Sequence, residues 1–173
     1  RCIAWVDHNL KADKGRAGIF KYDLRTGKLS KKYILPDSGH ALGDLTIARD
    51  GTIFATDSIS PVIYKIDPKR DQIEEFIRSD SFASLQGITT DGRSTLYVAD
   101  YAKGIFRIDA ATRKVVQLTQ TERITLLGID GLYFYRGKLI AIQNGVNPNR
   151  VISLNFNGID KDKIDSMTTL EAN

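Results

Sequence analysis

Several side chains whose oxygen atoms can bind a cation or a polar molecule recur at related positions of this chain. They are carboxylates and amides that stand next to short apolar runs: Asp7, Asp44, Asp57, Gln86, Asp100, Asp130 and Asn144. Oxygen ligands of this kind suit a hard divalent cation such as Ca²⁺ or Mg²⁺. Such a cation could polarise a carbonyl group and lower the pKa of a bound water. The set therefore predicts a small-molecule site that could also hold a divalent cation.

Each of these residues also has a structural interpretation. An aspartate at the end of a strand often accepts hydrogen bonds from the turn that follows, which would account for Asp57 and Asp100. Gln86 could line a channel without binding a metal. For Asp130 a functional and a structural role are equally compatible with the pattern.

Two loops carry further candidate groups. His40, in loop 38–44, could act as a general base or orient a substrate, or it could simply pack against its neighbours. Loop 144–150 is rich in amides and ends in Arg150, so it could bind a sugar or an acid. Asn-Gly and Asn-Pro are also ordinary turn sequences. We therefore expect catalytic roles for Asp130 and His40, and substrate-binding roles for a second set: Asp44, Asp57, Asp100, Asn144 and Arg150.

A repeat of about 44 residues must position these groups. Similar segments run over 45–57, 88–100 and 132–144, and each is followed by a phrase of the type Gly-Ile-Phe-Arg-Ile-Asp. A period of this length with strand-like content indicates a propeller blade. Alternation within the second strand of each repeat predicts one buried face, which would include the pairs Ile53 with Ala55, Leu96 with Val98, and Ile140 with Ile142.

The predicted fold is all-β, a single β-propeller domain or fragment over 1–173, built of four-stranded antiparallel blades at about 1–36, 43–78, 86–119 and 127–171. The first copy begins at its second strand, so about 3.75 blades are present. A closed ring of four is possible in principle, but the repeat length favours part of a six-bladed ring. No helix is expected, apart from at most a single turn in 78–85. Because the first two strands of a blade are antiparallel, the candidate oxygens should gather at one end of the ring.

The best blade also resembles a known family. The phrases 85–88, 91–92, 96–100 and 104–109 resemble a blade of the gluconolactonase–regucalcin family of six-bladed propellers, and the likeness covers most of 43–157. The resemblance implies an axial divalent cation and hydrolysis of a small substrate such as a sugar lactone. It implies that Asp130 is a metal ligand and catalytic residue. Gln86 and Gly43 stand where the family has asparagine ligands.

Composition and charge limit the partners and functions that the sequence allows. The net charge is +4, but the cations are scattered, which argues against a nucleic-acid partner. No apolar run is long enough to span a membrane. One cysteine excludes an intrachain disulfide, and a secreted, periplasmic or cytoplasmic location is compatible with the sequence. Two functions remain open: a lactonase-like hydrolase with its site at the central funnel, or a non-catalytic propeller that binds a ligand or a protein through the same face.

Overall fold

The structure is a computed structural model that describes residues 2–5 and 16–172. These residues form β-strands and turns, and none of them lies in a helix. Residues 78–85, where a single helical turn was conceivable, form the end of a strand and a turn. Asp7 lies outside the described residues.

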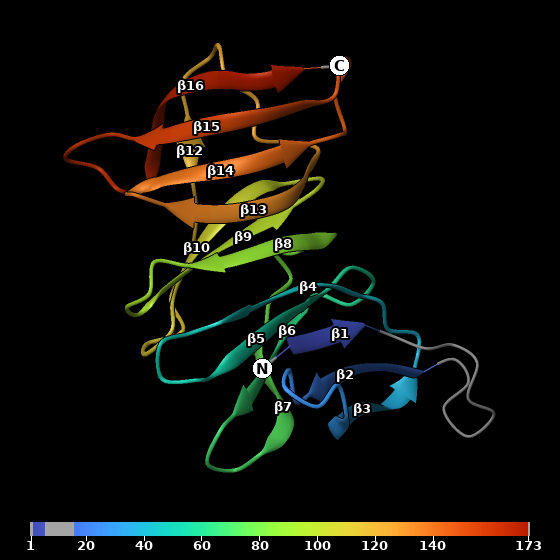
Figure 1. Ribbon diagram of the computed structural model, residues 1–173. Coiled ribbons are helices and arrows are strands. Elements are labelled where there is room, and N and C mark those ends of the chain that lie inside the picture. Colours follow the sequence, from blue (N-terminus) through green and yellow to red (C-terminus); the bar gives the residue numbers. More distant parts are fainter. Residues whose placement is uncertain (1, 6–15, 173) are drawn as a thin grey trace.

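The strands form four sheets in chain order (Figure 1). The first contains β1 (Cys2–Trp5), β2 (Arg16–Tyr22) and β3 (Leu29–Ser38). The second contains β4 (Leu42–Ile47), β5 (Ile53–Asp57), β6 (Val62–Asp67) and β7 (Gln72–Arg78). The third contains β8 (Leu85–Thr90), β9 (Thr95–Asp100), β10 (Gly104–Asp109) and β11 (Val115–Gln117). The fourth contains β13 (Ile129–Tyr135), β14 (Lys138–Gln143), β15 (Arg150–Phe156) and β16 (Lys163–Ala172), with β12 (Thr119–Gln120) added parallel to β16.

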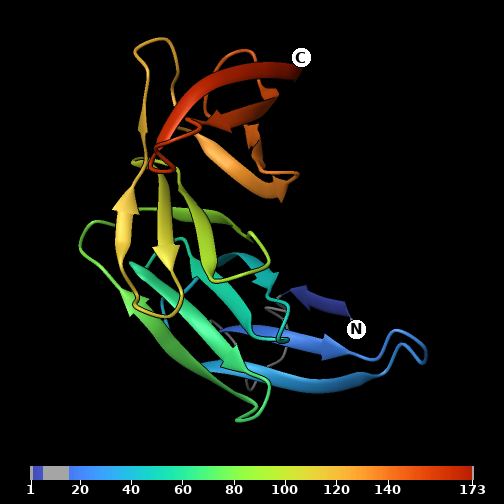
Figure 2. The same cartoon turned by 90° about the vertical axis from the view of Figure 1, so that its left-hand side faces the viewer.

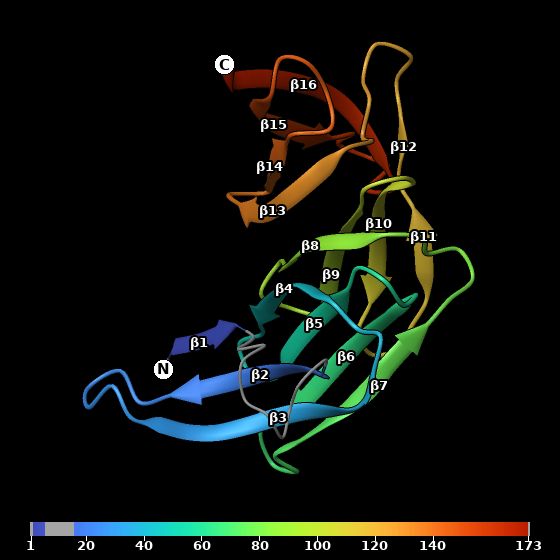
Figure 3. The same ribbon diagram turned by 90° about the vertical axis from the view of Figure 1, so that its right-hand side faces the viewer.

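The sheets follow one another around an open arc. Figures 2 and 3 view this arc from opposite sides, and in Figure 3 β4, β8 and β13 lie along its concave edge while β3, β7 and β11 lie on the outside. Within each complete sheet, consecutive strands pair antiparallel as a meander. This is the architecture of propeller blades placed around a common axis. The expected all-β propeller fold is therefore confirmed.

The core lies between consecutive sheets, where their facing apolar side chains are buried. Three clusters fill the three seams, and they include Leu35 with Val62, Ile63 with Leu96, and Ile105 with Leu139. Burial of a large apolar side chain contributes about 1.5–3 kcal/mol. The seams therefore hold the sheets at fixed angles and fix where the ends of the inner strands lie.

One predicted core face was wrong in the fourth sheet. The register pairs Leu132 with Ala141, whereas Ile88 pairs with Val98, so Leu139 and Ala141 point into the seam with the third sheet. Ile140 and Ile142 lie on the opposite face, and Ile142 is 42% exposed. The β13–β14 hairpin is one residue shorter than the β8–β9 hairpin, and a slip of one residue exchanges the two faces of a strand.

Candidate ligand-binding site at the axial end of the inner strands

The innermost strand of each complete sheet carries an irregularity at the same place. The register shifts between Leu42 and Leu45, between Leu85 and Ile88, and between Ile129 and Gly131. A β-bulge leaves backbone groups unpaired and turns side chains away from the regular alternation. Three candidate residues lie in these bulges, namely Asp44, Gln86 and Asp130. The sheets therefore bring these side chains to the same end of the inner strands, which is called the axial end here, as the antiparallel arrangement predicted.

Asp44 connects two sheets. Its Oδ2 accepts a hydrogen bond from the backbone N–H of Ile88, at 3.2 Å, and its Oδ1 accepts one from Leu45 N, at 2.7 Å. Burial of this carboxyl raises its pKa, the two backbone donors act in the opposite direction, and the charge of Asp130 raises the pKa further. Asp44 therefore joins the second and third sheets through its two backbone donors.

Asp130 and Asn144 form the exposed part of the site. Asn144 Nδ2 donates a hydrogen bond to Asp130 Oδ2 at 2.9 Å, and both side chains are exposed. A carboxylate that accepts from one amide keeps further lone pairs available for a ligand. The structure thus places these two residues in contact, whereas their roles in catalysis and binding stay predictions.

Gln86 belongs to a polar network between the second and third sheets. Its Oε1 accepts from Ser58 Oγ and its Nε2 donates to Ser84 Oγ, both at 3.3 Å. Its backbone carbonyl accepts from the buried Thr56 Oγ1 at 2.6 Å. The side chain is thus already hydrogen-bonded at both of its polar atoms.

The described residues do not fit the cation site that the family resemblance implies. A Cβ on Gly43 would lie 2.8 Å from Ser58 Oγ and 3.0 Å from the carbonyl oxygen of Leu85, so this position has no room for a ligating side chain. The Gln86 amide is engaged with two serines. Among residues 2–5 and 16–172, no three His, Cys, Asp or Glu side chains gather in a way that could hold a metal ion.

Asp57 and Asp100 have structural surroundings. Both are fully buried. Asp100 accepts from the backbone N–H groups of Ala83 and Ser84 with one oxygen and from Ala102 and Lys103 with the other. Each aspartate thereby connects the crossover that enters its sheet with the turn that follows its own strand. A substrate-binding role for them stays a prediction.

Gln143 occupies the corresponding place in the fourth sheet, which sequence reasoning assigned to Asn144. The residue pairs are Leu85 with Asp100 and Ile129 with Gln143. Gln143 is fully buried, and its Nε2 donates to the carbonyls of Thr125 and Leu127, at 3.0 and 2.6 Å. Its Oε1 accepts from Arg150 Nε at 2.8 Å. This hydrogen bond links the two ends of loop 144–150, so Arg150 Nε has a structural partner. The two-residue turn at Arg136 and Gly137, both with positive φ, is the signal that could have revealed the shift.

His40 lies between two carboxylates. Its Nδ1 is 2.5 Å from Asp57 Oδ2 and its Nε2 is 3.1 Å from Asp37 Oδ1, and the side chain is only 9% exposed. Burial opposes protonation of the imidazole, but the hydrogen bonds to Asp57 and Asp37 outweigh it and raise the pKa of His40. The edge of the ring meets Tyr64, whose pKa burial raises to about 12. His40 lies in the connection between β3 and β4. Its contacts with Asp37 of β3 and Asp57 of β5 therefore join the first sheet to the second. Its catalytic role stays a prediction.

Four-stranded sheets arranged around an axis, with polar side chains at the axial end of the inner strands, define a β-propeller. No protein-family model and no curated protein sequence matches the chain.

In the part of the chain that the structure describes, no helix has the length and apolar character needed to cross a membrane.

Solved structures with the same fold include a chain of the nidogen–laminin complex, with a TM-score of 0.70, 15% identity and coverage of 99% of this chain and 61% of that one. They also include virginiamycin B lyase from Staphylococcus aureus, with a TM-score of 0.66, 18% identity and coverage of 91% and 49%. A third example is an auxiliary nutrient binding protein from Bacteroides thetaiotaomicron, with a TM-score of 0.63, 14% identity and coverage of 92% of this chain and 39% of that one. The fold is therefore shared with lyases and with binding proteins, and the chain spans less than two thirds of each of these structures.

Proposed function

We propose that this chain is part of a propeller that binds a small polar molecule at the axial end of its inner strands. The observation that carries the proposal is the contact between Asp130, in the bulge of β13, and Asn144, directly after β14, at the same end of the inner strands as Asp44. The hydrogen bonds of Asp44 to backbone donors hold its carboxylate in place, while Asp130 and Asn144 offer exposed oxygen and N–H groups. This combination suits the hydroxyl and carbonyl groups of a sugar or sugar lactone.

A second candidate function, hydrolysis of a lactone or ester, is favoured by the interaction between Asp44 and Asp130. A carboxyl group whose pKa is raised by burial, as at Asp44, can supply a proton while an exposed carboxylate at the same site accepts one. In this reaction Asp130, which is exposed, would take a proton from the water whose oxygen adds to the carbonyl carbon. Asp44 in its protonated form would give its proton to the leaving alkoxide oxygen as the acyl C–O bond breaks. No step of this proposal involves a metal, because Gly43 and Gln86 do not supply the ligands that such a site requires.

Further blades complete the ring in this proposal. Tyr133 pairs with Ile140, and Ile142 pairs with Val151, on the face of the fourth sheet that no other sheet of the described residues covers. Tyr133 and Ile142 are 57% and 42% exposed. An apolar sheet face of this kind is covered by the next blade in the other three sheets. Together with the partial coverage of the similar structures, this supports a larger ring, for which the repeat length suggests six blades.

The test uses glucono-1,5-lactone as a probe with the full-length protein. Binding is followed by the chemical shifts of backbone amides, and hydrolysis by base uptake at constant pH above the spontaneous rate. We expect saturable shifts at Asp130 and Asn144 that Asp130→Asn weakens, while the same substitution at the exposed Asp165 leaves them unchanged. Absence of saturable shifts at these residues with lactone and open-chain sugar acid would contradict the binding site. Binding without catalysed base uptake would contradict only the hydrolase.

A further inference from the structure

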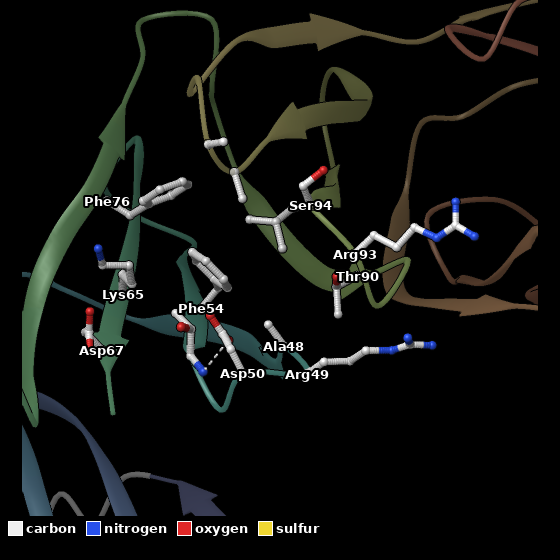
Figure 4. A pocket seen from close by; sticks show the side chains of 14 residues that line it. Ala48, Arg49, Asp50, Phe54, Lys65, Asp67, Phe76, Thr90, Arg93 and Ser94 are labelled. Atoms are coloured by element: carbon white, nitrogen blue, oxygen red, sulfur yellow. Dashed lines mark hydrogen bonds between the residues drawn. The ribbon is translucent and has the colours of Figure 1, made fainter. Parts of the chain in front are cut away.

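A groove lies between the second and third sheets at the end opposite to the candidate site. It has a volume of about 440 Å³ and is formed by the β4–β5 and β8–β9 hairpins together with β6 and β7 (Figure 4). Phe54, Phe76 and Leu96 line its apolar part, and Thr90 and Ser94 provide hydroxyl groups. A volume of this size accommodates a small organic molecule.

Two arginines from different sheets stand at one side of this groove. Figure 4 shows the side chains of Arg49 and Arg93 extending in the same direction, away from Phe54 and Phe76. A Cβ on Gly92 would lie 3.1 Å from Arg49 Nε and 3.7 Å from its Cζ, so the Arg49 guanidinium lies against the turn that carries Arg93. The two hairpins therefore place two cations at the same side of the groove.

Neither guanidinium has a carboxylate partner among the residues that the structure describes. The nearby acids are engaged in their own turns. Asp50 Oδ1 accepts from Thr52 N at 2.9 Å, Asp91 Oδ1 from Arg93 N at 2.8 Å, and Asp67 Oδ1 from Lys69 N at 2.7 Å. Lys65, inside the groove, is paired with Glu74 at 3.0 Å. The two arginines are thus the cations of the groove that remain available to a ligand.

We propose that this groove binds a small organic anion, with its carboxylate or phosphate group held by Arg49 and Arg93 and its apolar body in the groove. An oxyanion that both guanidinium groups reach accepts charge-assisted hydrogen bonds from each of them. Phe54 and Phe76, which are 5% and 4% exposed, line the groove with apolar surface that inorganic phosphate could not use. The site is separate from the axial site, so its occupation is independent of the proposed function.

The experiment titrates the full-length protein with phenyl phosphate, phenylacetate and inorganic phosphate at constant ionic strength, and follows the amide shifts of 48–52 and 90–94. We expect saturable binding of at least one aromatic anion, tighter than that of inorganic phosphate. Arg49→Gln and Arg93→Gln should each weaken it at least about tenfold. Arg123→Gln, at an exposed arginine of another loop, is the matched control and should change nothing.

Arg49→Lys and Arg93→Lys separate specific recognition from general attraction. They keep the charge but lose the planar fork of donors, so binding should still weaken. Amide spectra and melting temperatures of all variants should match the wild type, because both arginines are exposed. The proposal is overturned if no aromatic anion shows saturable binding, if inorganic phosphate binds as tightly, or if Arg123→Gln weakens binding as much as the two groove variants.

Discussion

The carboxylate of Asp44 in β4 accepts the backbone N–H of Ile88 in β8, so that a side chain of one blade completes the hydrogen bonding of the next. The bulge in β8 releases this N–H from the strand ladder. A released backbone donor in a buried position requires a partner. The same carboxylate that belongs to the candidate site therefore also joins two sheets.

Replacement of Asp44 by Ala should destabilise the protein. It would leave the N–H groups of Ile88 and Leu45 without their acceptor, which costs roughly 1–3 kcal/mol. Urea unfolding at pH 7 measures the effect, and Asp165→Ala on the exposed face of β16 is the control. Equal stability of the two variants would contradict a structural role for Asp44.

The pKa shift of His40 predicts a pH dependence of stability. Its folded-state pKa is raised, so the protonated form is favoured in the folded protein. The resulting stabilisation is complete below the unfolded-state pKa of about 6.5 and is lost as the pH rises through the folded-state pKa. We expect the free energy of unfolding to fall on this alkaline side of about 6.5, measured by urea unfolding between pH 5 and 9. In His40→Gln this part of the dependence should disappear, and its persistence would show that another group is responsible.

Gly87 should tolerate no side chain. A Cβ at this position would lie 2.5 Å from Leu132 N and 2.9 Å from the carbonyl oxygen of Asp130, both backbone atoms of the neighbouring inner strand. Gly87→Ala should therefore cost about 1–3 kcal/mol in thermal or urea unfolding, through forced separation of β8 and β13. Gly158→Ala is the matched control, because a Cβ there meets nothing within 4 Å. A neutral Gly87→Ala would mean that the two strands are farther apart.

Divalent cations should have little effect on this chain. Gly43 has no side chain and Gln86 is hydrogen-bonded to two serines, so Asp130 lacks partners for octahedral or higher coordination. Titration calorimetry with CaCl₂ and MgCl₂ should give no saturable heat, and the melting temperature should not change. A calcium-dependent rise in melting temperature that Asp130→Asn abolishes would contradict this expectation and would restore the family's metal site.

Much of the architecture could be predicted because each repeat carries the alternation of a strand and the turn residues of a hairpin. The placement of Gln86 and Asp130 at one end followed from the antiparallel pairing alone. The assignment of Asn144 to the place of Asp100 was wrong because it matched residues by chemical type. The shorter hairpin at Arg136 and Gly137 moves Gln143 into that place instead.

The amino-acid sequence by itself determined that the chain forms successive antiparallel sheets with polar groups at their inner ends, because strand periodicity and turn chemistry are local properties. Only the tertiary structure decided which of these groups meet. Asp57 and Asp100 accept hydrogen bonds from several backbone N–H groups, whereas Asp130 and Asn144 contact each other and stay exposed. Such choices depend on bulges and on distances between strands far apart in the chain, which no local pattern records.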